Sequence, residues 1–399
     1  MHEVINNHRS ATDEELKLRM SLFLLTFLFL YGGMHYYAYR KVGSAVSLPL
    51  PAVCALVLFM LIMVLAPLFV RLLEREGFDT IAVPLAFVGY LWMGFLFLFI
   101  IFMLAIDLGR VLIQAGGQFF QRDFSGIFSD RQAFFVAVAF SLGVSLYGYR
   151  EAQAIRMEKV VVSTTKLPST IKSFRIVQIS DVHLGLIVQE QRLQKIIREI
   201  EKAQPDLLVS TGDLLDGQTD GLTDLAVALG KVQPPFGKIA VTGNHEFYSG
   251  IDGFLQFTKR GNFSVLRGEM QDVAGLVSVV GVDDPADTQH GNGKIREEDI
   301  LRKAPHGRFV LLLKHRPVVA KESVGLFDLQ LSGHVHKGQI FPFELMTYLF
   351  YPVKTGLSRI TASSNLYVSR GTGTWGPPIR FLAPPEVTVI DLVNSSVTK

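Results

Sequence analysis

Cysteine and charge are both scarce in this sequence of 399 residues. The single cysteine, Cys54, excludes an intrachain disulfide and leaves the redox compartment undecided. Charged residues make up 19% of the chain and hydrophobic residues 49%, whereas ordinary soluble domains contain roughly 25% charged residues. This composition excludes a disordered chain, a coiled coil and a disulfide-rich miniprotein. The net charge of +3 is too small to indicate a nucleic-acid partner.

The shortage of charge is concentrated in the first half of the chain. Residues 20–149 hold 13 charged side chains in 130 positions. Charge-free runs cover residues 21–39, 42–70, 80–106 and 132–149. Because a helix needs about 20 apolar residues to cross a bilayer, we predict four transmembrane helices rather than buried helices of a soluble domain. This divides the first half into a polar N-terminal segment (1–20) and a membrane region (21–149).

Four uncleaved spans place both ends of the membrane region on the same side of the bilayer. We expect the first run to be retained, because twenty residues precede it and no small-residue cleavage site follows it. The segments on the terminal side contain 9 Lys and Arg residues, and those on the other side contain 5. Positive residues accumulate on the cytoplasmic side of membrane proteins. The sequence therefore predicts a multi-pass protein of the cell (inner) membrane whose C-terminal half is cytoplasmic.

The second half has the composition of a soluble α/β domain. Short β-branched runs alternate with polar helical stretches, which is typical of layered α/β packing. We expect strands at 159–162, 175–180, 207–210, 238–242, 277–282, 309–313, 329–332 and 387–392. A surface helix is predicted over 193–202, and a helical extension of the fourth span over 150–158. We therefore expect a helical linker with a first strand (150–172) and a globular domain (173–399).

Five of the predicted strands end in side chains that can bind metal ions. These side chains are Asp181, His183, Asp213, Asn244, His315, His334 and His336. Sites in open α/β sheets lie at the carboxyl ends of strands, so the five loops are expected to converge. Two pairs are separated by one residue, and an extended backbone points such residues to the same side. Gly212, Gly243 and Gly333 permit sharp turns before the ligands.

Imidazole, carboxylate and amide donors without thiolates suit Mn, Fe, Zn or a similar divalent ion. Two ions about 3.5–4 Å apart are the usual means of activating water for displacement at phosphorus. Taken singly, each motif also has a purely structural interpretation: Asp213 in a turn, Asn244 as a helix cap, His334 and His336 as surface histidines. Their combined order at five strand ends favours a metal site. His245, next to a ligand, is the imidazole available as a general acid.

Together these motifs resemble the calcineurin-like metallophosphoesterase superfamily over residues 174–393. The matching motifs are Asp181-x-His183, Gly212-Asp213-x-x-Asp216, Gly243-Asn244-His245-Glu246, Lys314-His315 and Gly333-His334-x-His336. The resemblance implies a four-layer α/β/β/α sandwich with two divalent metal ions. It implies one ion held by Asp181, His183, Asp213 and His336, and a second held by Asp213, Asn244, His315 and His334. It also implies in-line attack by a metal-bridging hydroxide, with His245 protonating the leaving oxygen.

Segments 333–340 and 369–378 are similar to a membrane-associated bacterial branch, which includes UDP-2,3-diacylglucosamine pyrophosphatase-like and multi-span transmembrane phosphoesterases. Lys337 stands where many relatives have a small residue, and it faces either substrate phosphate or water. We therefore predict a membrane-anchored hydrolase of phosphoesters or pyrophosphates with a lipid- or nucleotide-linked substrate. The sequence does not indicate an oligomeric state.

Two alternative functions are weighed against hydrolysis. A catalytically silent scaffold would lack ligands or the acid, whereas this sequence has all of them. A regulatory domain of a transporter would accompany spans with ionisable groups, whereas the four runs hold only His35 besides tyrosines.

One further segment bears on the substrate. Residues 341–352 are rich in Phe, Leu and Tyr and directly follow the last predicted ligands. They are either a packed loop over the domain core or an apolar lip that enters the bilayer interface and admits an acyl chain.

Overall fold

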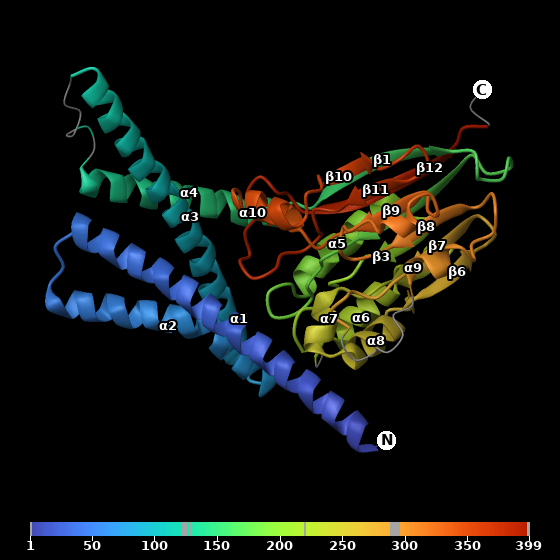
Figure 1. The fold of residues 1–399 in the computed structure, drawn as a ribbon, viewed down its shortest axis with the longest axis horizontal. Coiled ribbons are helices and arrows are strands. Elements are labelled where there is room, and N and C mark those ends of the chain that lie inside the picture. Colours follow the sequence, from blue (N-terminus) through green and yellow to red (C-terminus); the bar gives the residue numbers. More distant parts are fainter. Residues whose placement is uncertain (1, 122–126, 128, 219–220, 288–295, 397–399) are drawn as a thin grey trace. The chain divides into compact units, whose positions relative to one another are not determined.

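The structure is a computed structural model in which the chain divides into two compact units (Figure 1). It describes residues 2–121, 127, 129–218, 221–287 and 296–396, with side chains from residue 21 onward except at 23. The first unit comprises Met1–Phe69 and Val88–Ser145, and the second comprises Val70–Phe87 and Leu146–Lys399. Arg122, one of the positive residues counted above, and the side chains of the polar segment 1–20 lie outside the described residues.

The N-terminal half is helical, as its charge-free runs predict. The helices are α1 (His2–Ala45), α2 (Leu50–Arg75), α3 (Asp79–Phe119) and α4 (Asp130–Gln153). Among the described residues, α2, α3 and α4 are long and apolar enough to cross a membrane. Three of the four predicted spans are therefore confirmed by length and composition. The span at 21–39, which lies inside α1, stays a prediction.

Side chains from all four helices form one apolar core in the first unit. Its buried members are Tyr31, Ala38, Met60, Leu96, Phe99, Met103, Ala133 and Ala137. An ion pair adds to this packing, since Lys41 Nζ on α1 donates to Asp107 Oδ2 on α3 at 2.6 Å. Leu58, Leu112 and other large apolar side chains remain exposed on the helices, which suits contact with lipid.

The second unit contains two six-stranded mixed sheets (Figure 1). The first has the order β1 (Arg156–Thr164), β12 (Glu386–Asn394), β2 (Ser173–Ile179), β3 (Leu207–Ser210), β4 (Lys238–Ala240) and β5 (Ser264–Val265). The second has the order β10 (Gly356–Arg359), β11 (Asn365–Val368), β9 (Leu329–Ser332), β8 (Phe309–Leu313), β7 (Val277–Gly281) and β6 (Glu269–Val273). The central strands β2, β3 and β4 are parallel, as are β7, β8 and β9. Parallel neighbours bring their carboxyl ends to one edge of each sheet.

Apolar clusters lie between the two sheets and on both outer faces. Buried residues of β2, β3, β7 and β8, such as Ile176 and Leu311, form the cluster between the sheets. Helices α5 (Glu190–Ala203), α6 (Thr223–Gly230) and α8 (Ile251–Arg260) pack against the outer face of the first sheet. Ile300 and Leu301 of α9 (Glu297–Leu301) pack against outward-facing residues of β7 and β8. Each of the two sheets therefore has apolar packing on both of its faces.

The predicted strands are present with small changes of length, and the helix predicted over 193–202 is α5. The short strands β5, β6, β10 and β11 were not predicted, because each has few residues and weak alternation. The helical extension over 150–158 is wrong beyond Gln153: α4 ends there and β1 begins at Arg156. Pairing of β1 with β12 along nine residues supplies backbone hydrogen bonds that override the local helical preference.

Candidate metal centre

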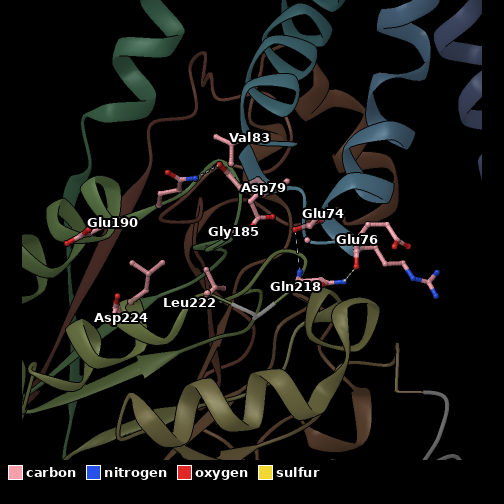
Figure 2. Close-up of a pocket in the computed structure, with 15 residues that line it drawn as sticks. Glu74, Glu76, Asp79, Val83, Gly185, Glu190, Gln218, Leu222 and Asp224 are labelled. Atoms are coloured by element: carbon pink, nitrogen blue, oxygen red, sulfur yellow. Dashed lines mark hydrogen bonds between the residues drawn. The ribbon is translucent and has the colours of Figure 1, made fainter. Parts of the chain in front are cut away.

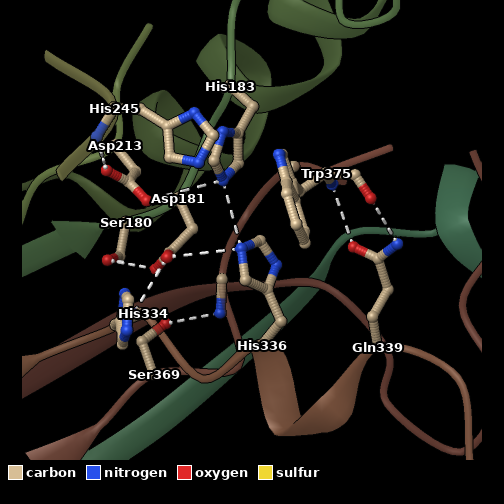
Figure 3. A network of polar contacts seen from close by, with 12 residues as sticks. Ser180, Asp181, His183, Asp213, His245, His334, His336, Gln339, Ser369 and Trp375 are labelled. Atoms are coloured by element: carbon tan, nitrogen blue, oxygen red, sulfur yellow. Dashed lines mark hydrogen bonds and ion pairs between the residues drawn. The ribbon is translucent and has the colours of Figure 1, made fainter. Parts of the chain in front are cut away.

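Six of the seven side chains predicted as ligands converge on one small volume. Figure 3 shows Asp181, His183, Asp213, His334 and His336 of this group. The seven predicted ligands follow β2, β3, β4, β8 and β9 in the two sheets. Three groups of possible ligand atoms lie within 4.8 Å of one another: Asp181, His183 and His336; His183, Asp213 and His245; Asp213, His315 and His334. The groups share members, so they form one continuous centre rather than separate sites.

The first part of the centre contains Asp181, His183 and His336. Nε2 of His336 lies 3.1 Å from Nε2 of His183 and 3.3 Å from Oδ1 of Asp181. These three atoms face one another directly. They belong to three of the four residues predicted to hold the first ion. The fourth residue, Asp213, is next, with Oδ2 3.8 Å from Nε2 of His183.

The second part is built around Asp213, His315 and His334. Oδ2 of Asp213 lies 3.1 Å from Nε2 of His315, and Nδ1 of His334 lies 3.1 Å from the same His315 nitrogen. Asn244 begins helix α7 (Asn244–Ser249) and is buried, and the N–H of the next residue, His245, donates to Oδ1 of Asp213 at 2.9 Å. The structure therefore brings together six of the seven residues predicted as ligands, and the role of Asn244 stays a prediction.

The backbone reaches this arrangement by left-handed turns and not by extended strands. Positive φ angles occur at Asp181, His183, Asp213, His334 and His336, between 48° and 73°. The expectation that an extended backbone aligns each pair is wrong. His334 and His336 in fact belong to different ligand groups. Such conformations are unfavourable for residues other than glycine, and they concentrate at functional sites where the surrounding structure enforces them.

Two glycines allow the loops to approach one another closely. A Cβ at Gly212 would lie 2.6 Å from the Gly243 nitrogen and 2.7 Å from Nδ1 of His315. A Cβ at Gly333 would collide with Ser180 and the Asp181 carboxylate. Any larger residue at either position would push ligands apart.

One unsatisfied polar atom tests whether these residues fit metal ions. Oδ1 of Asn244 is buried and has no hydrogen-bond partner among the described residues, and such an atom is costly unless a ligand satisfies it. The carbonyl oxygen of Asn244 is a donor atom suited to a hard or borderline cation. The residues therefore fit divalent ions.

The charges at the centre also favour cations. Burial lowers the pKa of His315, but the negative charges of Asp213 and Asp181 outweigh burial and raise it to about 10. The same field attracts a metal ion, whose binding displaces the proton. By contrast, burial and then the charge of His315 lower the pKa of His334 to about 3. Burial and the charge of Arg380 lower the pKa of His336 well below its ordinary value. Both rings are therefore neutral and able to ligate.

His245 lies at the edge of the centre with a carboxylate partner of its own. Its Nδ1 is 3.0 Å from Oδ1 of Asp216. Burial lowers the pKa of His245, but the charges of Asp213 and Asp216 raise it to about 9. The imidazole is therefore protonated near neutral pH. The His245 ring lies edge-on to the ring of His183, with 4.7 Å between the two centroids. His245 therefore lies next to a predicted ligand.

Several residues that hold the centre in place were not predicted. Glu246 is buried and accepts backbone N–H groups of Asp213, Leu214 and Gly243 at 2.6–3.0 Å. It joins the loop after β3 to the loop after β4. Arg380 is fully buried, with Nη2 3.0 Å from Nδ1 of His336. The burial of Glu246 and Arg380 and their hydrogen-bond partners come from segments distant in the sequence, so they could not be predicted. Glu246 does belong to the motif Gly243-Asn244-His245-Glu246, which could have drawn attention to it.

Two aromatic residues border the centre. Trp375 lies 5.8 Å from His245 between ring centroids, and its backbone is fixed by two hydrogen bonds to the Gln339 amide (Figure 3). The hydroxyl oxygen of Tyr351 lies 3.1 Å from Nε2 of His334. Both residues stand in segments singled out in the sequence, at 369–378 and 341–352, without an assigned role.

The end of α2 contacts the loop that carries Asp216. Nη2 of Arg71 donates to Oδ1 of Asp216 at 3.2 Å, and the Gln218 N–H donates to Oε1 of Glu74 at 3.3 Å. Figure 2 shows Glu74 and Gln218 side by side at a cavity of about 490 Å³. Gly217 has a φ of 90°, and a Cβ there would collide with the Glu74 carboxylate. The loop is therefore shaped to receive this helix end.

Known proteins share this sequence pattern. The sequence model of calcineurin-like phosphoesterases matches residues 174–338. An uncharacterized metallophosphoesterase of Aquifex aeolicus is 36% identical over 249 residues, covering 62% of this chain and 95% of that protein. One from Bacillus subtilis is 33% identical over 264 residues, covering 63% and 91%. A transmembrane protein with a metallophosphoesterase domain from Danio rerio is 30% identical over 271 residues, covering 64% and 62%.

Proposed function

Because this chain belongs to the calcineurin-like phosphoesterase family, we propose that it hydrolyses phosphoesters or pyrophosphates with two divalent ions at the centre described above. The observation that carries the two-metal proposal is the position of Asp213. Its Oδ2 lies 3.8 Å from His183 in one ligand group and 3.1 Å from His315 in the other. A carboxylate that reaches both groups is what a pair of neighbouring ions requires.

The seven ligands divide between the two ions as the sequence predicts. Asp181, His183, Asp213 and His336 hold one, and Asp213, Asn244, His315 and His334 hold the other. Bound divalent ions supply an activated water and neutralise the charge of the phosphoryl oxygens. The nitrogen and oxygen donors suit manganese, iron or zinc. The clusters on both outer faces and between the sheets support the four-layer α/β/β/α arrangement around this centre.

His245 acts as the general acid. Asp216 accepts its Nδ1–H, so Nε2 carries the proton that passes to the leaving oxygen. The hydrogen bond to the Asp216 carboxylate favours the protonated ring, as a general acid requires. Trp375 beside the ring limits how far the imidazole can turn. A catalytically silent scaffold would not need this hydrogen-bonded acid.

The protein is an integral membrane enzyme with four spans, both ends of the membrane region in the cytoplasm and the catalytic domain at the inner surface of the cell membrane. Three apolar helices and the distribution of Lys and Arg support this topology. A catalytic centre held at a bilayer favours a lipid-linked substrate. A nucleotide-linked substrate that carries a lipid tail would also reach it.

The test is metal analysis of the purified full-length protein combined with a substrate panel. The panel contains an aryl phosphodiester, a nucleoside diphosphate–sugar lipid, a lysophospholipid and a cyclic nucleotide. We expect about two divalent ions per chain, turnover of at least one substrate, and loss of both metal and turnover in Asp213→Asn. An Asp213→Asn protein that kept full metal content and activity would contradict the assignment.

A further inference from the structure

Helix α10 (Phe343–Phe350) is an apolar helix on the surface of the globular domain. None of its eight side chains is buried. Exposed large apolar or aromatic groups occupy six of its positions: Phe343, Leu345, Met346, Tyr348, Leu349 and Phe350. Leu349 and Phe350 are 74% and 76% exposed. The alternative of a packed loop over the core is therefore wrong, and a contiguous apolar surface of this kind marks a contact with a membrane or another protein.

The segment before α10 is linked to the last turns of α4 through Arg380 and Phe381. The Phe341 N–H donates to the carbonyl of Phe381 at 3.1 Å, and the Phe381 ring meets Tyr147 of α4 edge-on at 6.1 Å. The Arg380 N–H donates to the carbonyl of Gly148 at 2.9 Å. The charge-free run of α4 ends at residue 149. These contacts link Phe341 to the point where the predicted span of α4 ends.

The same helix is attached to the metal centre. The turn η2 (His336–Gly338) contains one ligand, and a Cβ at its Gly338 would lie 2.5 Å from Cα of Glu344 in α10. At the other end of α10, the Tyr351 hydroxyl reaches Nε2 of His334 at 3.1 Å. The two ends of α10 therefore lie next to the segment that carries His334 and His336.

A cavity beside α10 is lined by more basic than acidic groups. Its volume is about 380 Å³, and its charged lining residues are Lys337, Lys354 and Glu344, next to Tyr348 and Tyr351. Lysines next to apolar and aromatic side chains are typical of segments that bind the surface of anionic bilayers. A phosphorylated headgroup is the chemistry that two ammonium groups beside a metal centre would recognise.

We propose that α10 inserts into the headgroup region of the bilayer that holds α4 and delivers phosphorylated lipids to the metal centre from the membrane side. The partner is the lipid bilayer. The delivery of substrate rests on the proposed hydrolase function, whereas the insertion of α10 does not. Two measurements separate these parts.

The first measurement detects insertion directly. Cys54 is the only cysteine, so a Cys54→Ser background allows an environment-sensitive fluorophore at Leu349→Cys in full-length protein in anionic nanodiscs. Val161 on β1 is 61% exposed and provides the matched control, Val161→Cys. We expect lipids with a quencher near the headgroup to quench the probe at position 349 at least threefold more than the probe at position 161. Equal quenching, or a disulfide between two chains through the thiol introduced by Leu349→Cys, would overturn insertion.

The second measurement tests delivery. The double variant Leu349→Ser/Phe350→Ser should turn over a phospholipid in the bilayer about tenfold more slowly than the parent, with unchanged turnover of a soluble aryl phosphodiester. Val161→Ser should change neither rate. Equal losses on both substrates would overturn delivery. If the parent hydrolyses neither substrate, the proposed function fails, while the quenching result still decides whether α10 inserts.

Discussion

The histidines of the centre have the same side chain but opposite electrostatic environments. Burial and neighbouring positive charge keep His334 and His336 neutral, while two carboxylates keep His245 protonated. When the surroundings of two histidines move their pKa values apart, one site can contain both neutral metal ligands and a protonated acid. The roles follow from what surrounds each ring and cannot be assigned from the residue type.

The acid role of His245 leads to a prediction at this scale. His245→Ala should slow hydrolysis of a substrate with a poor leaving group by roughly 10²–10⁴, because general acid catalysis contributes about that much. An activated nitrophenyl leaving group needs little protonation and should be affected far less. Metal content should stay at the level of the parent protein, measured by plasma mass spectrometry. Equal slowing of both substrates would assign His245 to metal binding or folding.

At the scale of elements, the end of α2 supports the loop that positions the acid. Arg71 pairs with Asp216, Asp216 holds His245, and Glu74 receives the N–H of Gln218. The chain of contacts joins the end of α2 to the imidazole of His245, the proposed general acid. On this proposal Arg71 and Asp216 are positioning residues that act through His245.

Arg71→Ala should slow hydrolysis of the poor-leaving-group substrate by about 1.4- to 5-fold, because an exposed ion pair contributes about 0.2–1 kcal/mol. Arg71→Lys should restore part of this loss. In the His245→Ala background the same substitution should have no further effect, since the acid it positions is absent. The matched control is Arg75→Ala, because Arg75 contacts the loop through its carbonyl oxygen. Additive losses in the double variant would contradict the positioning role.

At the scale of the whole molecule, an apolar helical region and a polar hydrolase domain share one chain. Helix α4 leads into β1 after two residues, so the link between them is too short to act as a free tether. The membrane region therefore restricts where the catalytic domain can work. This restriction is the physical reason to expect substrates at the bilayer surface.

Reporter fusions test the predicted sidedness. Alkaline phosphatase, which is active only outside the cytoplasm, should be active when fused after residue 47 and inactive when fused after residue 399. Green fluorescent protein at the same two positions should give the opposite result. This follows from four spans and from the 9-to-5 distribution of Lys and Arg. Activity of the phosphatase at both positions or at neither would contradict the predicted topology, because an odd number of crossings must separate the two positions.

The sequence alone determined the elements that depend on local pattern. Charge-free runs gave the apolar helices, β-branched runs gave the principal strands, and the motifs at strand ends named all seven candidate ligands and His245. The extension to 158 was wrong because pairing of β1 with β12 decides the conformation there. The extended pairing of Asp181 with His183 was wrong because their close neighbours impose left-handed turns.

Only the tertiary structure decided what depends on contacts between distant segments. It joined Asp216 to Arg71, placed Glu246 between two loops, put Arg380 next to His336, and left α10 exposed. Hydropathy and motif spacing are properties of neighbouring residues, so they can be read along the chain. The partner of a buried charge and the exposure of an apolar helix depend on which other segments pack there, and the fold alone fixes that.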